Sequence, residues 1–224
     1  MPIVPQINTF ERAEEFIKDW EDKKILDYGG NIGSLLTNSK GLIHPKNYSC
    51  IDVSLEAIDH GKKIYPDATW IHYDRYNPAF NKESELIGLG APNFNHNKKY
   101  DIIFSHSVFT HTSIEEWIYM YEKFKKNLNP SGIMCHTYID FEWNNQMVEK
   151  LYQRRIQQYG ATIRIDDFFD YCYFVNNDTF TQDFPTDDRR HVVSYYKREY
   201  LKKTFPECYF KRGIHQSAVL YSND

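Results

Sequence analysis

Long apolar runs are missing from this chain of 224 residues. No stretch approaches the roughly 20 consecutive apolar residues that a membrane-spanning helix needs, and no signal peptide opens the sequence. Cysteine is also scarce, since the four cysteines lie far apart and form no C-x-x-C pair. Buried free thiols in a reducing compartment are the expected state. The sequence therefore predicts a cytoplasmic protein without a membrane segment.

Charge of one sign is not concentrated in any long block, and the formal net charge is −4. Domains that bind nucleic acid usually carry a basic face, so nucleic acid is disfavoured as the main partner. Internal repeats, low-complexity segments and clear linkers are absent too. Because 41% of the residues are hydrophobic, a full core is within reach. We expect a single domain over residues 1–224.

Metal-ligand patterns are also lacking. Zinc-type histidine and cysteine spacing does not occur. The acidic pairs Asp166-Asp167 and Asp187-Asp188 fall late in the chain, where solvated turns explain them better than a catechol-type metal site. We expect no metal.

Residues 24–33 contain the most informative local pattern. An apolar run ends in Asp27 and Tyr28 and then opens into Gly29, Gly30 and Gly33. This order predicts a buried strand, a tight turn and a helix. Glycine lets a ligand lie against bare backbone, and a helix N-terminus adds unpaired N–H groups. The dinucleotide fingerprint G-x-G-x-x-G is not matched, because the spacing here is G-G-x-x-G.

A second acid, Asp52, ends the next expected strand at residues 48–54. In doubly wound folds an acid in this place takes a ribose hydroxyl pair. The alternative is a helix-cap or turn aspartate, but Ser54 already suits the cap of the following helix. Ribose binding is therefore the better reading of Asp52.

Strand and helix patterns alternate along the chain. Further strands are expected at 24–28, 68–74, 101–105 and 133–138, with a pair inside 208–221, and helices at 8–21, 54–64, 143–159 and 196–204. Another helix opens with a capping-box pattern at Ser113–Glu116 and carries an apolar stripe of Ile114, Trp117, Ile118, Tyr121, Phe124 and Leu128. The alternation predicts an α/β, doubly wound, mostly parallel sheet with its ligand at the carboxyl ends of the strands.

Together these segments resemble the class I S-adenosylmethionine-dependent methyltransferases. The resemblance is carried by residues 25–33, Asp52, Tyr73-Asp74, residues 100–111 and residues 128–133. The stretch 107–111 also resembles a subgroup of bacterial methyltransferases from glycan and natural-product pathways. The family implies a Rossmann-like seven-stranded sheet with an antiparallel last strand, helices on both faces, and S-adenosyl-L-methionine as cofactor.

The resemblance also implies roles for single residues. The methionine end of the cofactor would be lined by Asp27, Gly29, Gly30 and Gly33, and the neighbouring Tyr28 and Asn31 would also bind the cofactor. Asp52 would hold the ribose hydroxyls, Val53 would pack on the adenine and Asp74 would meet the adenine amino group. Ser105 and His106 would pass under the sulfonium. Tyr28 and Tyr138 are candidates to face the sulfonium, although packing is the commoner role of such tyrosines.

The acceptor is expected to be a small molecule, with a hydroxyl oxygen receiving the methyl group. The Asn/Asp-Pro-Pro-aromatic motif of nucleic-acid amino-methyltransferases is replaced by residues 105–108. Nitrogen and carbon acceptors, RNA bound by a basic cluster between residues 197 and 212, and a non-catalytic cofactor-binding partner remain alternatives. The aromatic stretch 160–195 is expected to form a lid or wall over the acceptor.

A hydroxyl acceptor needs a base, and histidine is best suited to this task near neutral pH. His111 is the first candidate because it ends the loop after the fourth expected strand, just before Ser113. His106 is the second candidate, since it is also expected beside the cofactor. Packing at the start of a helix is the competing interpretation of His111.

Overall fold

The computed structural model describes residues 8–77, 81, 83–84, 98–140, 171–175 and 192–223. Its main feature is a seven-stranded sheet in the order β3-β2-β1-β4-β5-β9-β8. Strands β1 to β5 run parallel, while β9 is antiparallel to both of its neighbours. This arrangement confirms the predicted Rossmann-like sheet with an antiparallel last strand. The strands are β1 (Ile25–Tyr28), β2 (Tyr48–Asp52), β3 (Thr69–His72), β4 (Tyr100–Ser105), β5 (Leu128–Tyr138), β8 (Tyr209–Lys211) and β9 (Ser217–Ser222).

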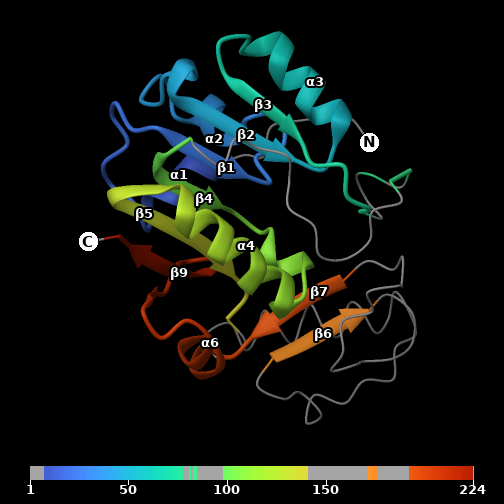
Figure 1. Cartoon of the computed structure of the whole chain (residues 1–224), viewed down its shortest axis with the longest axis vertical. Helices are drawn as coiled ribbons and strands as arrows, with labels where there is room; N and C mark the ends of the chain where they lie inside the picture. The colour runs from blue at the N-terminus through green and yellow to red at the C-terminus, as the bar shows by residue number, and fades with distance from the viewer. Residues whose placement is uncertain are drawn as a thin grey trace.

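Helices cover both faces of this sheet, because successive strand residues alternate between two apolar clusters. Leu26 and Ile103 face the cluster that α4 and α6 complete, whereas Ile25 and Phe104 face the cluster of α1, α2 and α3. Figure 1 shows α3 above the sheet edge and α4 across its front. The helices are α1 (Thr9–Glu14), α2 (Ser34–Asn38), α3 (Leu55–Ile64), α4 (Ile114–Asn127) and α6 (Arg198–Thr204), with short 3₁₀ turns η1 (Pro45–Asn47) and η2 (Phe109–His111).

From β1 the chain adds β2 and β3 on one side of the sheet, and then adds β4 and β5 on the other side. The switch point therefore lies between β1 and β4, which are hydrogen-bonded neighbours. In a doubly wound sheet, the loops leaving two such strands diverge to opposite faces and leave a crevice at their carboxyl ends. The glycine turn follows β1, and the loop with His106 and His111 follows β4. The fold therefore places the two most informative sequence segments on opposite sides of one crevice.

The N-terminal helix is shorter than predicted, because α1 ends at Glu14 rather than at residue 21. The backbone N–H groups of Phe16 and Ile17 both donate to the Ala13 carbonyl, which closes the helix. Ile17 and Trp20 are nevertheless buried, with the Trp20 indole N–H donating to the Ile17 carbonyl at 3.1 Å. The apolar spacing thus identified core residues but overstated the helix.

Two details of α4 and β5 also differ from expectation. Ile118 is 39% exposed rather than part of the buried stripe, and Met120 is buried instead. Strand β5 begins at Leu128 and includes the segment predicted to precede it, with a register shift in its pairing to β4. Ser131 in that segment has φ 58°, so the turn residues are absorbed as an irregularity of the strand.

A second, two-stranded antiparallel sheet is formed by β6 (Tyr171–Val175) and β7 (Val192–Tyr196). The Tyr196 N–H donates to the Ile139 carbonyl at 3.0 Å, and Figure 1 shows β7 beside the lower end of α4. The predicted helix at 143–159 and much of the predicted lid at 160–195 lie outside the described residues. Among the residues that are described, no helix is both long and apolar enough to cross a membrane.

Candidate functional site

A cavity of about 220 Å³ lies at the carboxyl ends of the strands, where the sheet order reverses. Its wall is built by the loops after β1, β2, β3 and β4 and by the first turn of α4. The lining residues are Tyr28, Gly29, Asn31, Ile51, Asp52, Val53, Ser54, Arg75, Asn77, His106, Ser107, Val108, His111, Thr112 and Glu116.

One side of the cavity, here called the β1–β2 wall, consists of Tyr28, Gly29, Asn31 and Asp52. Gly29 has φ 77°, and its N–H donates to the Ile51 carbonyl at 2.7 Å. A Cβ atom on Gly29 would collide with the Val108 side chain. Glycine is therefore required here both for its backbone conformation and for the close approach of the two loops.

Asp52 links the glycine turn to the start of α3. Its Oδ2 accepts from the Asn31 N–H at 2.7 Å, and its Oδ1 accepts from the Ser54 N–H at 2.9 Å. Burial raises the pKa of Asp52, while the N–H groups of Ser54 and Asn31 oppose that shift. An ionised carboxylate offers about four acceptor sites, so Asp52 keeps capacity for two further donors, such as a pair of hydroxyl groups.

Asp27 supports this wall from below. It is buried and accepts a 2.5 Å hydrogen bond from the Tyr48 hydroxyl, and burial raises its pKa to about 7. A Cβ atom on Gly30 would approach the Asp27 Oδ2 to 2.5 Å. Asp27 and Gly30 therefore pack against each other beneath the turn, and neither lines the cavity.

The facing side, here called the β4–α4 wall, consists of His106, His111, Thr112 and Glu116. His106 is 9% exposed, and burial lowers its pKa to about 4, with Arg12 and His215 adding to the effect. Its imidazole is therefore neutral at physiological pH. Within the described residues, the His106 Nδ1 has no hydrogen-bond partner.

The loop after β4 is fixed by contacts with β5 and the segment before β9. Ser107 has φ 57°, its N–H donates to the Thr137 Oγ1 at 2.9 Å, and its Oγ accepts from the Gln216 Nε2 at 2.5 Å. By contrast, the Ser105 Oγ lies 2.8 Å from the buried His136 Nδ1. Ser105 thus turns into the core, and only its neighbours line the cavity.

Glu116 and Arg75 form a pair that the sequence did not reveal. The Arg75 Nη2 donates to the Glu116 Oε2 at 2.6 Å, and the two side chains are only 11% and 4% exposed. Burial raises the pKa of Glu116 to about 7, although Arg75 opposes this. The other carboxylate oxygen, Oε1, is buried and without a hydrogen-bond partner in the described part of the chain.

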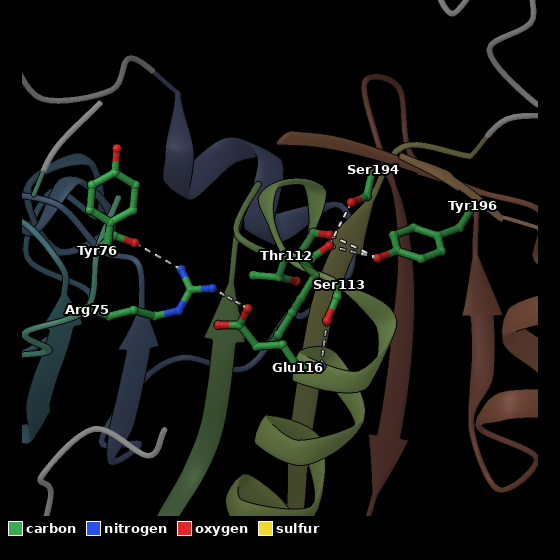
Figure 2. A network of polar contacts seen from close by, with 8 residues as sticks. Arg75, Tyr76, Thr112, Ser113, Glu116, Ser194 and Tyr196 are labelled. Carbon is green, nitrogen blue, oxygen red and sulfur yellow. Dashed lines mark hydrogen bonds and ion pairs between the residues drawn. The ribbon is translucent and has the colours of Figure 1, made fainter. Parts of the chain in front are cut away.

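The capping-box prediction is correct for the serine and wrong for the glutamate. The Ser113 Oγ accepts from the Glu116 N–H at 3.1 Å, as a helix cap does. The Glu116 side chain, however, turns away from the cap and towards Arg75, as Figure 2 shows. A glutamate on the buried side of α4 was the available signal, but its partner lies 41 residues earlier.

The loop in front of α4 is also held by β7. The Thr112 carbonyl accepts from the Ser194 Oγ at 2.7 Å and from the Tyr196 hydroxyl at 3.3 Å (Figure 2). The Thr112 hydroxyl is buried and has no hydrogen-bond partner among the described residues. The β4–α4 wall therefore contains three buried polar atoms, on His106, Thr112 and Glu116, that no described protein group satisfies.

Comparison with known proteins identifies the fold and a methyltransferase domain. Residues 26–134 match the family model of a methyltransferase domain. A search of curated protein sequences finds no match. Among solved structures, the chain is similar to DesVI from Streptomyces venezuelae, with 13% identity over 93% of this chain and 87% of that chain and a TM-score of 0.55.

It is also similar to an S-adenosylmethionine-dependent methyltransferase from Methanosarcina mazei, with 16% identity over 94% of this chain and 95% of that chain and a TM-score of 0.53. The fold is that of the class I S-adenosylmethionine-dependent methyltransferases, and residues 26–134 form a methyltransferase domain. A third similar structure is the magnesium protoporphyrin IX methyltransferase ChlM from Synechocystis PCC 6803 with bound S-adenosylhomocysteine, at 12% identity over 92% and 76% of the two chains and a TM-score of 0.50.

The cavity of this methyltransferase fits its cofactor, S-adenosylmethionine. The glycine turn offers bare backbone, Asp52 has acceptor capacity for ribose hydroxyls, and three of the lining residues carry a buried polar atom that no described group satisfies. No group of three or more histidine, cysteine, aspartate or glutamate side chains within the described residues is placed to hold a metal ion.

The predicted site residues divide into two groups in the structure. Those that line the cavity are Tyr28, Gly29, Asn31, Asp52, Val53, His106 and His111. Those that do not line it are Asp27, Gly30, Gly33, Asp74 and Ser105. Asp74 is exposed, and its Oδ1 accepts from the Asn81 Nδ2 at 3.1 Å. The following residues Arg75 and Asn77 line the cavity in its place.

Proposed function

We propose that this methyltransferase transfers a methyl group from S-adenosylmethionine to a small molecule, with a hydroxyl oxygen as the acceptor. The cavity between the β1–β2 wall and the β4–α4 wall is the observation that carries this proposal. A small acceptor is supported by the net charge of −4 and by the absence of the nucleic-acid amino-methyltransferase motif from the sequence. The similar protein ChlM acts on magnesium protoporphyrin IX, itself a small molecule.

The β1–β2 wall holds the cofactor in this proposal. Gly29 and Asn31 border the methionine end, and Asp52 accepts from the ribose hydroxyls. Val53 packs on the adenine. Asp27, Gly30 and Gly33 shape the turn from beneath, and Tyr28 closes the wall. In this proposal the side chains of Asp74 and Ser105 make no contact with the cofactor, because neither residue lines the cavity.

When bound, the cofactor supplies an electrophilic methyl group on a sulfonium. The protein contributes alignment, because in-line displacement is favoured when both reactants are held in near-attack geometry. His111 removes the acceptor's proton, since it lines the cavity on the β4–α4 wall. His106 is the less suitable base because burial holds its pKa at about 4, well below the working pH that a general base should match.

The predicted lid at residues 160–195 belongs to the same proposal. Ser194 of β7 bonds to the Thr112 carbonyl next to the cavity, which supports a role of this segment in the acceptor pocket. The arrangement of residues 1–224 as one domain and the cytoplasmic location stay predictions. The resemblance of residues 107–111 supports an acceptor from the biosynthesis of a glycan or natural product.

The test begins with calorimetry of S-adenosylhomocysteine on the wild-type protein, where micromolar binding is expected, or about −8 kcal/mol. Transfer of labelled methyl groups is then measured with pools of small hydroxyl, amine and carbon acceptors, and with RNA and folded protein as comparison. Labelling of hydroxyl compounds supports the proposal. Labelling confined to RNA or protein contradicts the small-molecule acceptor, and binding without any transfer favours a regulatory partner.

A further inference from the structure

The pair of Arg75 and Glu116 lies on one side of the proposed cofactor. Arg75 follows β3, and β3 pairs with β2 on the edge away from β1. With the methionine end at Gly29 after β1 and the ribose at Asp52 after β2, the next group along the cofactor points towards the loop after β3. That group is the adenine base, which Arg75 and Glu116 therefore face.

The Glu116 carboxylate is incomplete as a hydrogen-bonding group. Its Oε2 accepts from Arg75 at 2.6 Å, whereas its Oε1 has no partner in the described part of the chain although the residue is only 3% exposed. Leaving a buried acceptor unsatisfied destabilises a protein, and more strongly when the acceptor is charged. Glu116 is a lining residue of the cavity, so a donor on the ligand is the available partner for this oxygen.

The orientation of this carboxylate is fixed from two sides. Arg75 also donates from Nη1 to the Tyr76 carbonyl at 3.3 Å, and the Glu116 N–H is held by Ser113. Figure 2 shows Glu116 reaching from the first turn of α4 towards Arg75. The guanidinium occupies one carboxylate oxygen and leaves the other in place for a second donor.

Asp74, the acid that the family resemblance assigns to the adenine amino group, is not available in this geometry. It is exposed, does not line the cavity, and bonds to Asn81. The amino group thus needs another acceptor. Besides Asp52, the carboxylate among the described lining residues is Glu116, which reaches Arg75 in the loop after β3.

We propose, on the cofactor orientation given under Proposed function, that Glu116 Oε1 accepts a hydrogen bond from the 6-amino group of adenine. Glu116 is then the residue that selects adenine, and Arg75 is a positioning residue that holds its carboxylate. Replacing the amino group by a carbonyl, as in hypoxanthine, sets two oxygen acceptors against each other. A site built around such a polar contact rejects the mismatched analogue strongly.

The experiment measures the affinities of S-adenosylhomocysteine and S-inosylhomocysteine by calorimetry. The wild type is expected to prefer the adenosyl ligand by on the order of 100-fold. In Glu116→Gln this ratio falls at least tenfold, because the glutamine amide can turn to donate to the hypoxanthine carbonyl. Asp74→Asn is the matched control and keeps the wild-type ratio. The ratio is taken within each variant, which separates selectivity from any loss of active protein.

The outcomes are distinct. Equal affinity of the wild type for both ligands overturns the assignment without any variant. An unchanged ratio in Glu116→Gln together with a reduced ratio in Asp74→Asn transfers adenine selection to Asp74 and also overturns it. Failure of the wild type to bind S-adenosylhomocysteine at all overturns the proposed cofactor site itself.

Discussion

The two walls of the cavity differ in how complete they are without a ligand. On the β1–β2 wall, Asp52 already receives two backbone N–H groups, and Asp27 beneath it receives the Tyr48 hydroxyl. On the β4–α4 wall, His106, Thr112 and Glu116 each keep a buried polar atom that no described group satisfies. The polar groups of the first wall are held within the protein, whereas the second wall keeps buried polar atoms for which we propose a bound molecule as the partner.

This difference also explains which parts of the site could be predicted from the sequence. Local rules on glycine, strand ends and helix caps pointed to Tyr28, Gly29, Asn31 and Asp52 of the β1–β2 wall, but also to Asp27, Gly30 and Gly33, which do not line the cavity. The Ser54 cap is confirmed by its bond to the Ala57 N–H at 3.1 Å, and the sheet topology is confirmed as well.

The β4–α4 wall depends on partners far apart in sequence. Glu116 meets Arg75 from 41 residues away, and the Thr112 carbonyl meets Ser194 from 82 residues away. No local pattern encodes such pairs, and the capping-box rule assigned the Glu116 side chain to the wrong partner. The exposure of Asp74 was equally hidden, because it depends on how the loop after β3 leaves the sheet.

The largest effect is expected for turnover on the β4–α4 wall. Replacing His111 by glutamine removes the proposed base, so kcat falls by about 10²–10⁴-fold, while affinity for S-adenosylhomocysteine stays within about twofold. The acidic limb of the pH–kcat profile disappears in the variant. His60→Gln is the control, since His60 is exposed on α3. A loss of less than tenfold in His111→Gln removes His111 from the role and leaves alignment alone, or His106, to explain turnover.

On the β1–β2 wall we expect a loss of cofactor affinity instead of a loss of turnover. Asp52→Ala removes the proposed acceptor for the ribose and the acceptor for two backbone N–H groups, so affinity for S-adenosylhomocysteine is expected to fall by on the order of 100-fold, equivalent to about 2.7 kcal/mol. Asp67→Ala changes the same charge at an exposed position and leaves the affinity unchanged. Comparable affinity losses in Asp52→Ala and His111→Gln would contradict the proposal that the β1–β2 wall binds the cofactor while the β4–α4 wall supports turnover.

A smaller effect is expected on the unfolding free energy, where two Gly→Ala variants distinguish the cost of the backbone conformation from the cost of a close contact. Gly29 and Gly41 both have positive φ, at 77° and 93°, but a Cβ on Gly41 meets no atom within 4 Å. Gly41→Ala therefore loses about 1 kcal/mol of unfolding free energy. Gly29→Ala loses about 2 kcal/mol more because Val108 must move. Urea unfolding of both variants measures the difference, and equal losses would show that the two loops can separate without cost.

The last expected effect is a slope of at most about 1.4 kcal/mol per pH unit for one proton, and it concerns the two buried carboxylates. Burial raises the pKa of Asp27 to about 7, from about 4 in an unfolded chain. Between these values the folded state retains a proton that the unfolded state has lost. Stability is therefore highest below pH 4 as far as this group is concerned, and it declines as pH rises towards 7. Tyr48, which donates to Asp27, and the neighbouring Asp52 act on the same titration in opposite directions.

Glu116 contributes a slope of the same sign, because burial also raises its pKa to about 7. Asp27→Asn and Glu116→Gln are each expected to flatten the pH dependence of the unfolding free energy measured in urea, whereas Asp67→Asn leaves it unchanged. Measurements with saturating S-adenosylhomocysteine distinguish the contributions of the two walls to the pH dependence. An amino group donating to Glu116 favours its ionised form and lowers its pKa, so the ligand suppresses the Glu116 share of the slope. The Asp27 share persists, since the Tyr48 hydroxyl already occupies that carboxyl group beneath the turn. A slope that the ligand leaves unchanged in Asp27→Asn would mean that Glu116 meets no donor on the cofactor.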